Sequence, residues 1–285
     1  KSGIIPRYGK TNRRKNMNLG ICTMASSSSG NCYLVKSNRT NLLVDAGVAG
    51  RKVKSNLEML DIRLKDVDSI LLTHEHADHI KCASALYNLT SEAMFVATGG
   101  TAESLIINRK KPEADKVRII SAGETFMIGD IQVTAVETSH DAREPVAYTF
   151  ARNGKKISIV TDTGIVTPQI EKAIADSDIL VIEANHEENI LMYGRYPYNV
   201  KQRIKGDKGH LSNETAARCI CGMLRNLSEP KVPYIILAHL SKENNSPQQA
   251  LLTVRNFIEE AGFYADKSFR LHVADLNEMG DLIAV

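Results

Sequence analysis

Residues 69–79, SILLTHEHADH, constrain the fold of this chain more than any other stretch. A short apolar run, typical of a buried strand, leads at once into His74, His76, Asp78 and His79. In an extended loop, side chains two residues apart point the same way, so His74 and His76 can converge on one ion. Asp78 and His79 begin a helix over residues 80–89 and can face a second ion. Imidazoles and a carboxylate without a thiolate suit a catalytic site for Zn²⁺, Mn²⁺ or Fe²⁺ rather than a purely structural zinc site.

The H-x-H-x-D-H run resembles the signature of the metallo-β-lactamase superfamily. From about Leu19 to the C-terminus, the chain is also similar to one branch of it, the YycJ/WalJ/VicX group of exonucleases. The stretches that carry this resemblance are ASSSSGNCYLV, LLVDAG, THEHADHIK, TSHDAREP, VTDTG, GRYPYNVKQRIKGDKGHLSNE and LAHLS. The resemblance implies two divalent metal ions per chain and 5′-to-3′ exonuclease action, on DNA rather than RNA.

The order of strands and helices predicts an α/β fold, a four-layer αββα sandwich built from two successive halves. Short strands are expected at residues 19–23, 33–36 and 41–44, the first two joined by a turn over residues 26–31. Asn153-Gly154 predicts a type I′ hairpin, and Ser212 and Ser246-Pro247 predict helix starts. No linker divides residues 17–285, so we interpret them as a single domain, preceded by a basic arm or tag at residues 1–16.

Charge and cysteine content limit what can be expected about the binding partners and the cellular compartment of the protein. The net charge of +3 depends on six basic residues before Met17; without them, 30 basic residues face 33 acidic ones, so global charge does not predict nucleic-acid binding. The five cysteines lack any C-x-x-C spacing, which suits reduced thiols. No apolar run approaches the ~20 residues of a membrane span, and no signal peptide precedes Leu19. We therefore expect a cytoplasmic protein without membrane association.

Three further ligand-type residues follow predicted strands. His140 lies in TSHD, Asp162 in VTDTG and His239 in LAHLS, and all three match later motifs of the superfamily. The expected first metal site is therefore His74, His76 and His140, the second is Asp78, His79 and His239, and Asp162 bridges them. Two such ions, ~3.5–4 Å apart, would generate a bridging hydroxide near neutral pH, with Asp78 as a possible acceptor of its proton.

Residues outside the metal motifs complete the predicted site. Glu183 and the stretch Gly209-His210-Leu211-Ser212 resemble the paired elements of RNase Z-type nucleases, which implies that His210 is the general acid and that Glu183 orients it. Asp45 is expected to brace the histidine loop without binding metal, as the matching superfamily aspartate does. His186 is a second candidate for such a supporting role, and His272 is expected in the core.

Candidate substrate-binding residues lie in two loops. The hydroxyls and N–H groups of Ser28 and Ser29 could hold a phosphate. In the loop before His210, five cations are expected to grip a nucleic-acid backbone, and neighbouring tyrosines could stack on bases. The cations are Arg195, Lys201, Arg203, Lys205 and Lys208, and the tyrosines are Tyr193, Tyr196 and Tyr198.

The leading functional hypothesis is a dinuclear metal-dependent nuclease. The alternative is a small-molecule ester or thioester hydrolase of the glyoxalase II type, which shares the metal ligands but lacks the Glu183/His210 pair and the basic loop. A true β-lactamase is disfavoured because that branch commonly carries Arg at the position of His79. A redox di-iron protein is disfavoured because His76 stands where those proteins typically have Glu, and a binding module would need a missing ligand.

Overall fold

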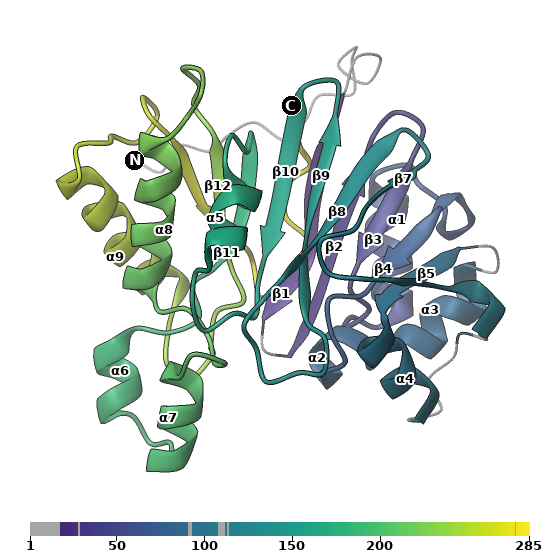
Figure 1. The fold of residues 1–285 in the computed structure, drawn as a ribbon, viewed down its shortest axis with the longest axis horizontal. Helices are drawn as coiled ribbons and strands as arrows, with labels where there is room; N and C mark the ends of the chain where they lie inside the picture. Colours follow the sequence, from purple (N-terminus) through teal and green to yellow (C-terminus); the bar gives the residue numbers. More distant parts are fainter. Residues whose placement is uncertain (1–17, 28, 91–92, 108–111, 113, 277) are drawn as a thin grey trace.

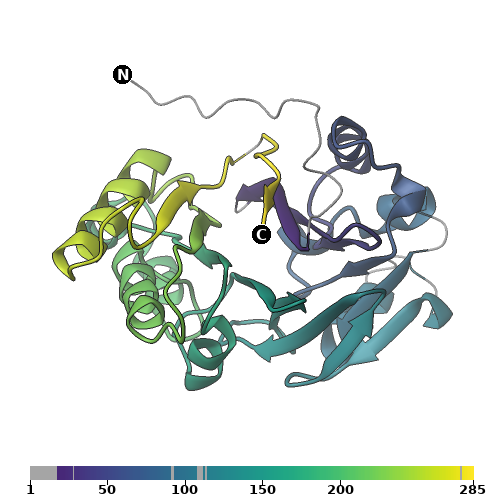
Figure 2. The ribbon, with the colours of Figure 1, turned by 90° about the horizontal axis from the view of Figure 1, so that it is seen from above.

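Two mixed β-sheets of seven strands each pack face to face with helices on their outer sides (Figure 1). The computed structural model describes residues 18–27, 29–90, 93–107, 112, 114–276 and 278–285. The first sheet has the order β14-β1-β2-β3-β4-β5-β6, and the second has the order β13-β12-β11-β10-β9-β8-β7. Figure 2 shows the same layers from above, with α8 and α9 outside one sheet and α1 outside the other. The predicted αββα sandwich is confirmed.

The strands of the first sheet are β1 (Gly20–Ser27), β2 (Gly30–Lys36), β3 (Asn41–Val44), β4 (Ser69–Leu71), β5 (Met94–Thr98), β6 (Val117–Ile120) and β14 (Ile283–Ala284). Those of the second are β7 (Thr125–Ile128), β8 (Ile131–Glu137), β9 (Val146–Arg152), β10 (Lys155–Val160), β11 (Ile179–Glu183), β12 (Tyr234–Ala238) and β13 (Arg270–Val273). The α-helices are α1 (Gly50–Met59), α2 (Ala77–Ile80), α3 (Ala83–Thr90), α4 (Gly99–Ile107), α5 (Pro168–Ile174), α6 (Glu188–Tyr193), α7 (Tyr198–Lys205), α8 (Asn213–Arg225) and α9 (Pro247–Glu260).

Alternation along the central strands buries both faces of each sheet. In β11, Ile179 and Val181 enter the core between the sheets, whereas Leu180 and Ile182 enter the core beneath α5, α8 and α9. A third core lies between the first sheet and its helices. Such two-sided burial explains why these strands read as continuous apolar runs. A central core shared by both sheets favours the single-domain interpretation, which stays a prediction.

Contacts between the sheets hold the carboxyl ends of several strands together. In each sheet four neighbouring strands are parallel, β3–β6 and β10–β13, so their carboxyl ends meet at one edge. The Tyr148 hydroxyl of β9 donates a hydrogen bond to the Leu72 carbonyl at 2.9 Å. The backbone N–H of His239 donates to Ser26 Oγ, also at 2.9 Å. Ligand sites in sheets of this kind form at such edges.

The predicted hairpin and the two predicted helix starts are confirmed. Asn153 and Gly154 have φ angles of 47° and 73°, as a type I′ turn requires. Ser212 and Ser246 accept hydrogen bonds from the third residue of their helices. None of the described helices has the length and apolar character that a membrane crossing requires.

Other predictions need correction. The helix expected over residues 80–89 is split into α2 and α3, and the loop expected before His210 contains α7, with α6 preceding it. The turn between the first strands is shorter than six residues, because β1 runs to Ser27 and β2 starts at Gly30. His272 lies on β13 but is exposed rather than in the core. The predicted arm at residues 1–16 lies outside the described residues.

Candidate dinuclear metal site

Three residues at strand ends adopt a left-handed backbone that is unusual outside glycine. Asp45 follows β3 with a φ of 66°, Asp162 follows β10 with 57°, and His239 follows β12 with 54°. This conformation costs ~1–2 kcal/mol per residue, and such strain persists where the surrounding structure enforces it, frequently at functional sites. All three side chains are buried beside the histidine motif.

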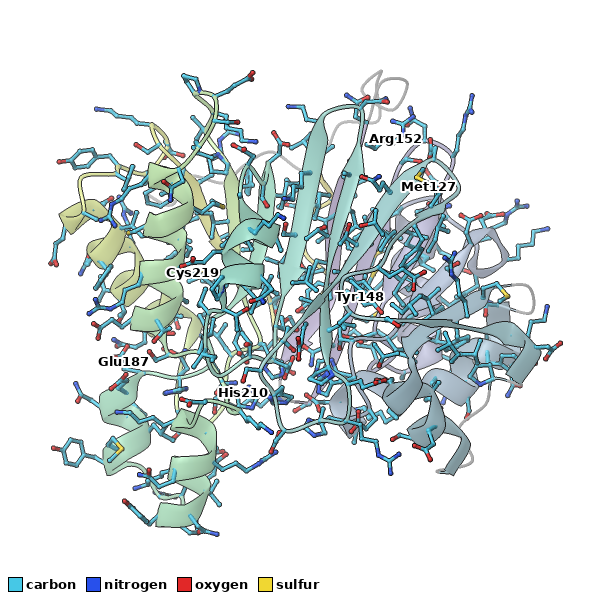
Figure 3. The ribbon with its side chains drawn as sticks, in the orientation of Figure 1. Met127, Tyr148, Arg152, Glu187, His210 and Cys219 are labelled. Carbon is cyan, nitrogen blue, oxygen red and sulfur yellow. The ribbon has the colours of Figure 1, made fainter. Side chains whose placement is uncertain are left out.

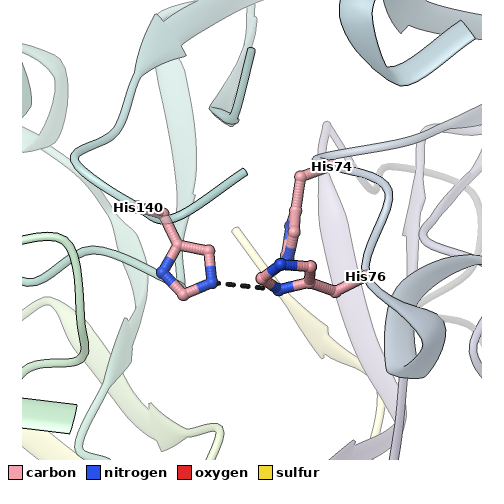
Figure 4. Close-up of side chains that lie close together, drawn as sticks. All are labelled: His74, His76 and His140. Carbon is pink, nitrogen blue, oxygen red and sulfur yellow. Dashed lines mark hydrogen bonds between the residues drawn. The ribbon is translucent and has the colours of Figure 1, made fainter. Parts of the chain in front are cut away.

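His74, His76 and His140 form the first group of potential ligands, with their ligand atoms within 4.8 Å of one another. His140 Nε2 lies 3.2 Å from His76 Nδ1 (Figure 4). His140 Nδ1 lies 3.0 Å from the carbonyl oxygen of Gly209, which can only accept, so Nδ1 carries the proton and Nε2 offers a lone pair. The buried Nε2 atom of His74 has no hydrogen-bond partner among the described residues. Lone pairs thus converge here, as a cation site requires.

Asp78, His79 and His239 form the second group. Asp78 Oδ2 lies 3.3 Å from His239 Nε2 and 3.4 Å from His79 Nε2. Asp162 lies between the groups: Oδ2 is 3.3 Å from His79 Nε2, and Oδ1 is 3.5 Å from His239 Nε2 and 3.7 Å from His140 Nε2. The structure therefore brings all seven predicted ligands together, with Asp162 where a bridging residue would stand.

Carboxylates behind two of the histidines fix the direction of their lone pairs. His79 Nδ1 lies 2.7 Å from Asp45 Oδ2, and His239 Nδ1 lies 2.8 Å from Glu183 Oε1. A carboxylate accepts, so each Nδ1 donates and each Nε2 faces the other ligands with its lone pair. This arrangement is the usual support for a metal-binding histidine.

The pKa values of the histidines and the unpaired buried atoms of the site also favour the binding of cations. Burial works to lower the pKa of His79 and of His239, but Asp162 and the other carboxylates outweigh it and raise both pKa values well above their usual value. Burial, reinforced by the neighbouring histidines, lowers the pKa of His74. Protonation of His79 and His239 could supply positive charge beside the carboxylates. The buried His74 Nε2 would still lack a hydrogen-bond partner among the described residues, and Asp162 Oδ2 would have only the His79 ring, at 3.3 Å and without a hydrogen bond. Divalent ions would satisfy both atoms, so the donor set fits such ions.

Asp45 holds the histidine loop from behind. Its Oδ1 atom accepts hydrogen bonds from the backbone N–H and the hydroxyl of Thr73, at 2.9 and 3.0 Å, while Oδ2 contacts His79. Gly47 lets the same strand end approach α2 closely, because a Cβ there would stand 1.7 Å from the carbonyl oxygen of Asp78. Asp45 thus has the position expected of a supporting residue.

Asn31 is a site residue that the sequence interpretation missed. Its Nδ2 atom lies 3.3 Å from Asp78 Oδ2 and 3.2 Å from His79 Nε2. Its Oδ1 atom accepts from the backbone N–H of Ser27 at 3.1 Å. The only sequence signal was its place in the SSSSGN turn. Of the two serines proposed there to hold phosphate, Ser29 is exposed, with its carbonyl oxygen hydrogen-bonded to Lys81, and Ser28 lies outside the described residues.

Glu183 joins the predicted general acid to the metal-ligand group. Its Oε1 atom lies 2.7 Å from His210 Nδ1 and 2.8 Å from His239 Nδ1. Its Oε2 atom accepts from the N–H groups of Leu211 and Thr163 at 3.1 and 3.3 Å. Burial opposes ionised Glu183, but His210 and His239 outweigh burial and lower its pKa. The contact with His210 was expected; the contact with His239 was not.

His210 lies where α7 meets the ends of the sheets (Figure 3). Burial works to lower its pKa, but Glu183 and Asp162 outweigh burial and raise it. Ligand atoms of His210, Glu183, Asp162 and His239 all lie within 4.8 Å of one another. His210 is therefore also close enough to these residues to be a metal ligand.

The side chain of His186 is buried beside these residues. Its Nδ1 atom has no hydrogen-bond partner among the described residues, and burial lowers its pKa to about 4. Its backbone pairs with Ser212, just after His210. The structure therefore places His186 near the site, and its expected supporting role stays a prediction.

The five predicted substrate-binding cations lie on or beside α7, and two of them already have acidic partners. Arg203 Nε lies 2.5 Å from Asp141 Oδ2, and Lys205 Nζ lies 3.1 Å from Glu188 Oε2. Lys201 Nζ donates to the carbonyl oxygen of Met192 at 2.8 Å. The remaining two, Arg195 and Lys208, are exposed. A cavity of about 390 Å³ beside His140 includes Lys208 in its wall. The positive charge of this segment is thus partly neutralised in the free protein.

The chain is similar in sequence to proteins of a known family. The family model of the beta-lactamase superfamily domain matches residues 40–228. The chain belongs to the metallo-β-lactamase superfamily. It is 36% identical over 261 residues to exodeoxyribonuclease YycJ of Bacillus anthracis, covering 91% of this chain and 96% of that protein. It is 35% identical over 251 residues to exodeoxyribonuclease WalJ of Streptococcus pneumoniae, covering 87% of this chain and 91% of the relative.

Solved structures agree on the fold. The metallo-beta-lactamase fold protein YhfI from Bacillus subtilis superposes with a TM-score of 0.68, covering 92% of this chain and 99% of its own, at 14% identity. The resemblance read from the sequence motifs, to the superfamily and to the YycJ/WalJ group, is therefore confirmed.

Proposed function

We propose that this protein is a metal-dependent phosphodiester hydrolase, and specifically a 5′-to-3′ exonuclease acting on DNA. One observation carries the proposal: the pair of buried Glu183 and partly buried His210, 2.7 Å between Oε1 and Nδ1, adjoins two converging groups of candidate metal-ligand side chains. Phosphodiester cleavage needs an acid near the metals because the leaving alkoxide must be protonated near neutral pH. Relatives named exodeoxyribonucleases support the substrate class.

The ligand scheme is part of the proposal. His74, His76 and His140 would hold one ion, Asp78, His79 and His239 a second, and Asp162 both. Zn²⁺ and Mn²⁺ suit this mixture of imidazoles and carboxylates, and Fe²⁺ is also compatible. When bound, two such ions would activate a water molecule and neutralise charge on the attacked phosphate.

The chain's own residues handle the protons. Glu183 fixes the ring of His210 through Nδ1, which leaves Nε2 to donate a proton to the leaving oxygen. Hydrogen bonds from His239 and His79 outweigh burial and lower the pKa of Asp78, so this carboxylate is ionised. We assign it the role of acceptor for the proton of the attacking water. Asp45 orients His79 from behind through Nδ1, and Asn31 orients Asp78 through Oδ2.

Binding of the DNA backbone is assigned to the α6–α7 segment. Tyr193 and Tyr198 are 90% and 72% exposed there, which leaves their rings available for stacking on bases. Tyr196 lies between them. The exposed hydroxyl of Ser29 is a further proposed contact for a phosphate, whereas its backbone N–H already donates to Ser27 Oγ at 3.2 Å.

The test uses purified protein loaded with Mn²⁺ or Zn²⁺ and single- and double-stranded DNA and RNA, each labelled at the 5′ or the 3′ end. A 5′-to-3′ exonuclease releases the 5′ label immediately as a mononucleotide and shortens 3′-labelled strands progressively. A generic thioester serves as the competing substrate. Fast thioester hydrolysis without nucleic-acid cleavage would instead establish the glyoxalase II type of activity.

A further inference from the structure

Asp141 lies at the mouth of the metal-ligand groups and was assigned no role from the sequence. Its Oδ1 atom lies 3.5 Å from His140 Nε2 and 3.8 Å from His76 Nε2. Its Oδ2 atom accepts a hydrogen bond from Arg203 Nε at 2.5 Å. One carboxylate therefore spans the distance between the rim of the candidate metal site and a cation of α7.

We propose that, in the free protein, the carboxylate of Asp141 occupies the position of a substrate phosphate and binds Arg203. When DNA binds, Arg203 leaves Asp141 and contacts the phosphate next to the scissile one. The inference rests on the proposed nuclease function. A phosphate offers the same pair of anionic oxygens as a carboxylate, and a guanidinium can bind either in two-pronged fashion. Arg203 would thus be the phosphate-contacting residue, and Asp141 a positioning residue that acts through it.

The geometry makes this exchange feasible. The side chain of Arg203 is 59% exposed and that of Asp141 is 31% exposed, so solvent and substrate can reach the pair. Exposed ion pairs are weak, so an incoming phosphate has little to overcome. The backbone N–H of Asp141 donates to the Lys208 carbonyl at 3.1 Å, which holds the backbone of Asp141 in place independently of Arg203.

A second exposed ion pair, on α9, provides a matched control. Arg255 Nε lies 2.9 Å from Glu259 Oε1, with side chains 52% and 31% exposed. Neither partner belongs to the segment assigned to DNA binding, and neither contacts a predicted metal ligand in any described interaction. If removal of a carboxylate acts only through the overall charge, the two variants should behave alike. If Asp141 competes with phosphate, only its removal should change substrate binding.

The experiment measures binding and turnover of an oligonucleotide for Asp141→Asn, Arg203→Ala, the double variant and the control Glu259→Gln. Binding is followed by fluorescence anisotropy with a cleavage-resistant phosphorothioate strand, and metal content is determined for each protein. We expect Asp141→Asn to lower Kd and KM about two- to fivefold, the range of an exposed ion pair, with kcat within about twofold. Arg203→Ala should raise both, and Glu259→Gln should leave both unchanged.

The double variant distinguishes the proposed transfer of Arg203 from Asp141 to phosphate from a general effect of removing a negative charge. Removing any negative charge near a nucleic acid could strengthen binding, but then Asp141→Asn would strengthen it equally in the Arg203→Ala background. The exchange predicts no gain in that background. An equal gain, a rise in KM for Asp141→Asn, or loss of metal from Asp141→Asn would each overturn the proposal. Tight DNA binding with this coupling but no cleavage by the parent protein would refute the nuclease function alone.

Discussion

Replacement of His210 by alanine isolates the general-acid step. Loss of a positioned acid lowers turnover of a natural phosphodiester by ~10²–10⁴, equivalent to ~3–5 kcal/mol of transition-state stabilisation. The site should otherwise survive the change. Glu183 would lose only the 2.7 Å contact with His210 and keep three others: His239 Nδ1 at 2.8 Å and the N–H groups of Leu211 and Thr163 at 3.1 and 3.3 Å.

The assay compares two substrates with the same reaction at phosphorus. A DNA strand expels a poor leaving group and needs the proton, whereas a nitrophenyl phosphodiester expels a stable phenolate and does not. His210→Ala should therefore lose most of its activity on DNA and far less on the nitrophenyl ester, with the metal content of the parent protein. His272→Ala is a suitable control, since His272 is an exposed histidine on β13.

Two results would refute this reasoning. Equal losses on both substrates would show that His210 does not donate the proton. Loss of metal would show instead that His210 acts as a ligand, as its position within 4.8 Å of the ligand atoms of Asp162, Glu183 and His239 permits.

Three further predictions concern the metals, the DNA contacts and the fold. Elemental analysis of active protein should find two transition-metal ions per chain, and chelation should abolish activity; one ion in fully active protein would contradict the dinuclear scheme. Arg203→Ala combined with Lys205→Ala should weaken binding of unrelated DNA sequences alike and lower the slope of log affinity against log salt by about one to two units; an unchanged slope would make α7 ordinary surface. Tyr148→Phe should lower the free energy of unfolding by about 1–2 kcal/mol, because the buried hydroxyl bonds the Leu72 carbonyl across the sheets; denaturant titration measures it, and no change would mean that this bond contributes nothing.

Features that depend on neighbours along the chain could be predicted from the order of residues. The candidate metal ligands could be picked out because they follow apolar strands, and the spacing within residues 74–79 limits which side chains could share an ion. The hairpin at Asn153-Gly154 and the helix starts after Ser212 and Ser246 follow from backbone preferences and capping within a few residues. These interactions are local, so the order of residues is sufficient to predict them.

Contacts between residues far apart in the chain could not be predicted in this way. Glu183 contacts both His210 and His239, Asn31 reaches Asp78, and Asp141 pairs with Arg203, although the partners lie 27, 56, 47 and 62 positions apart. No repeat or spacing encodes these pairs, because they depend on the strand order of two sheets and on the packing of one sheet against the other. The helices α6 and α7 were missed for a related reason. Their apolar side chains, such as the exposed Tyr193, lack the periodic buried face by which a helix is recognised in sequence.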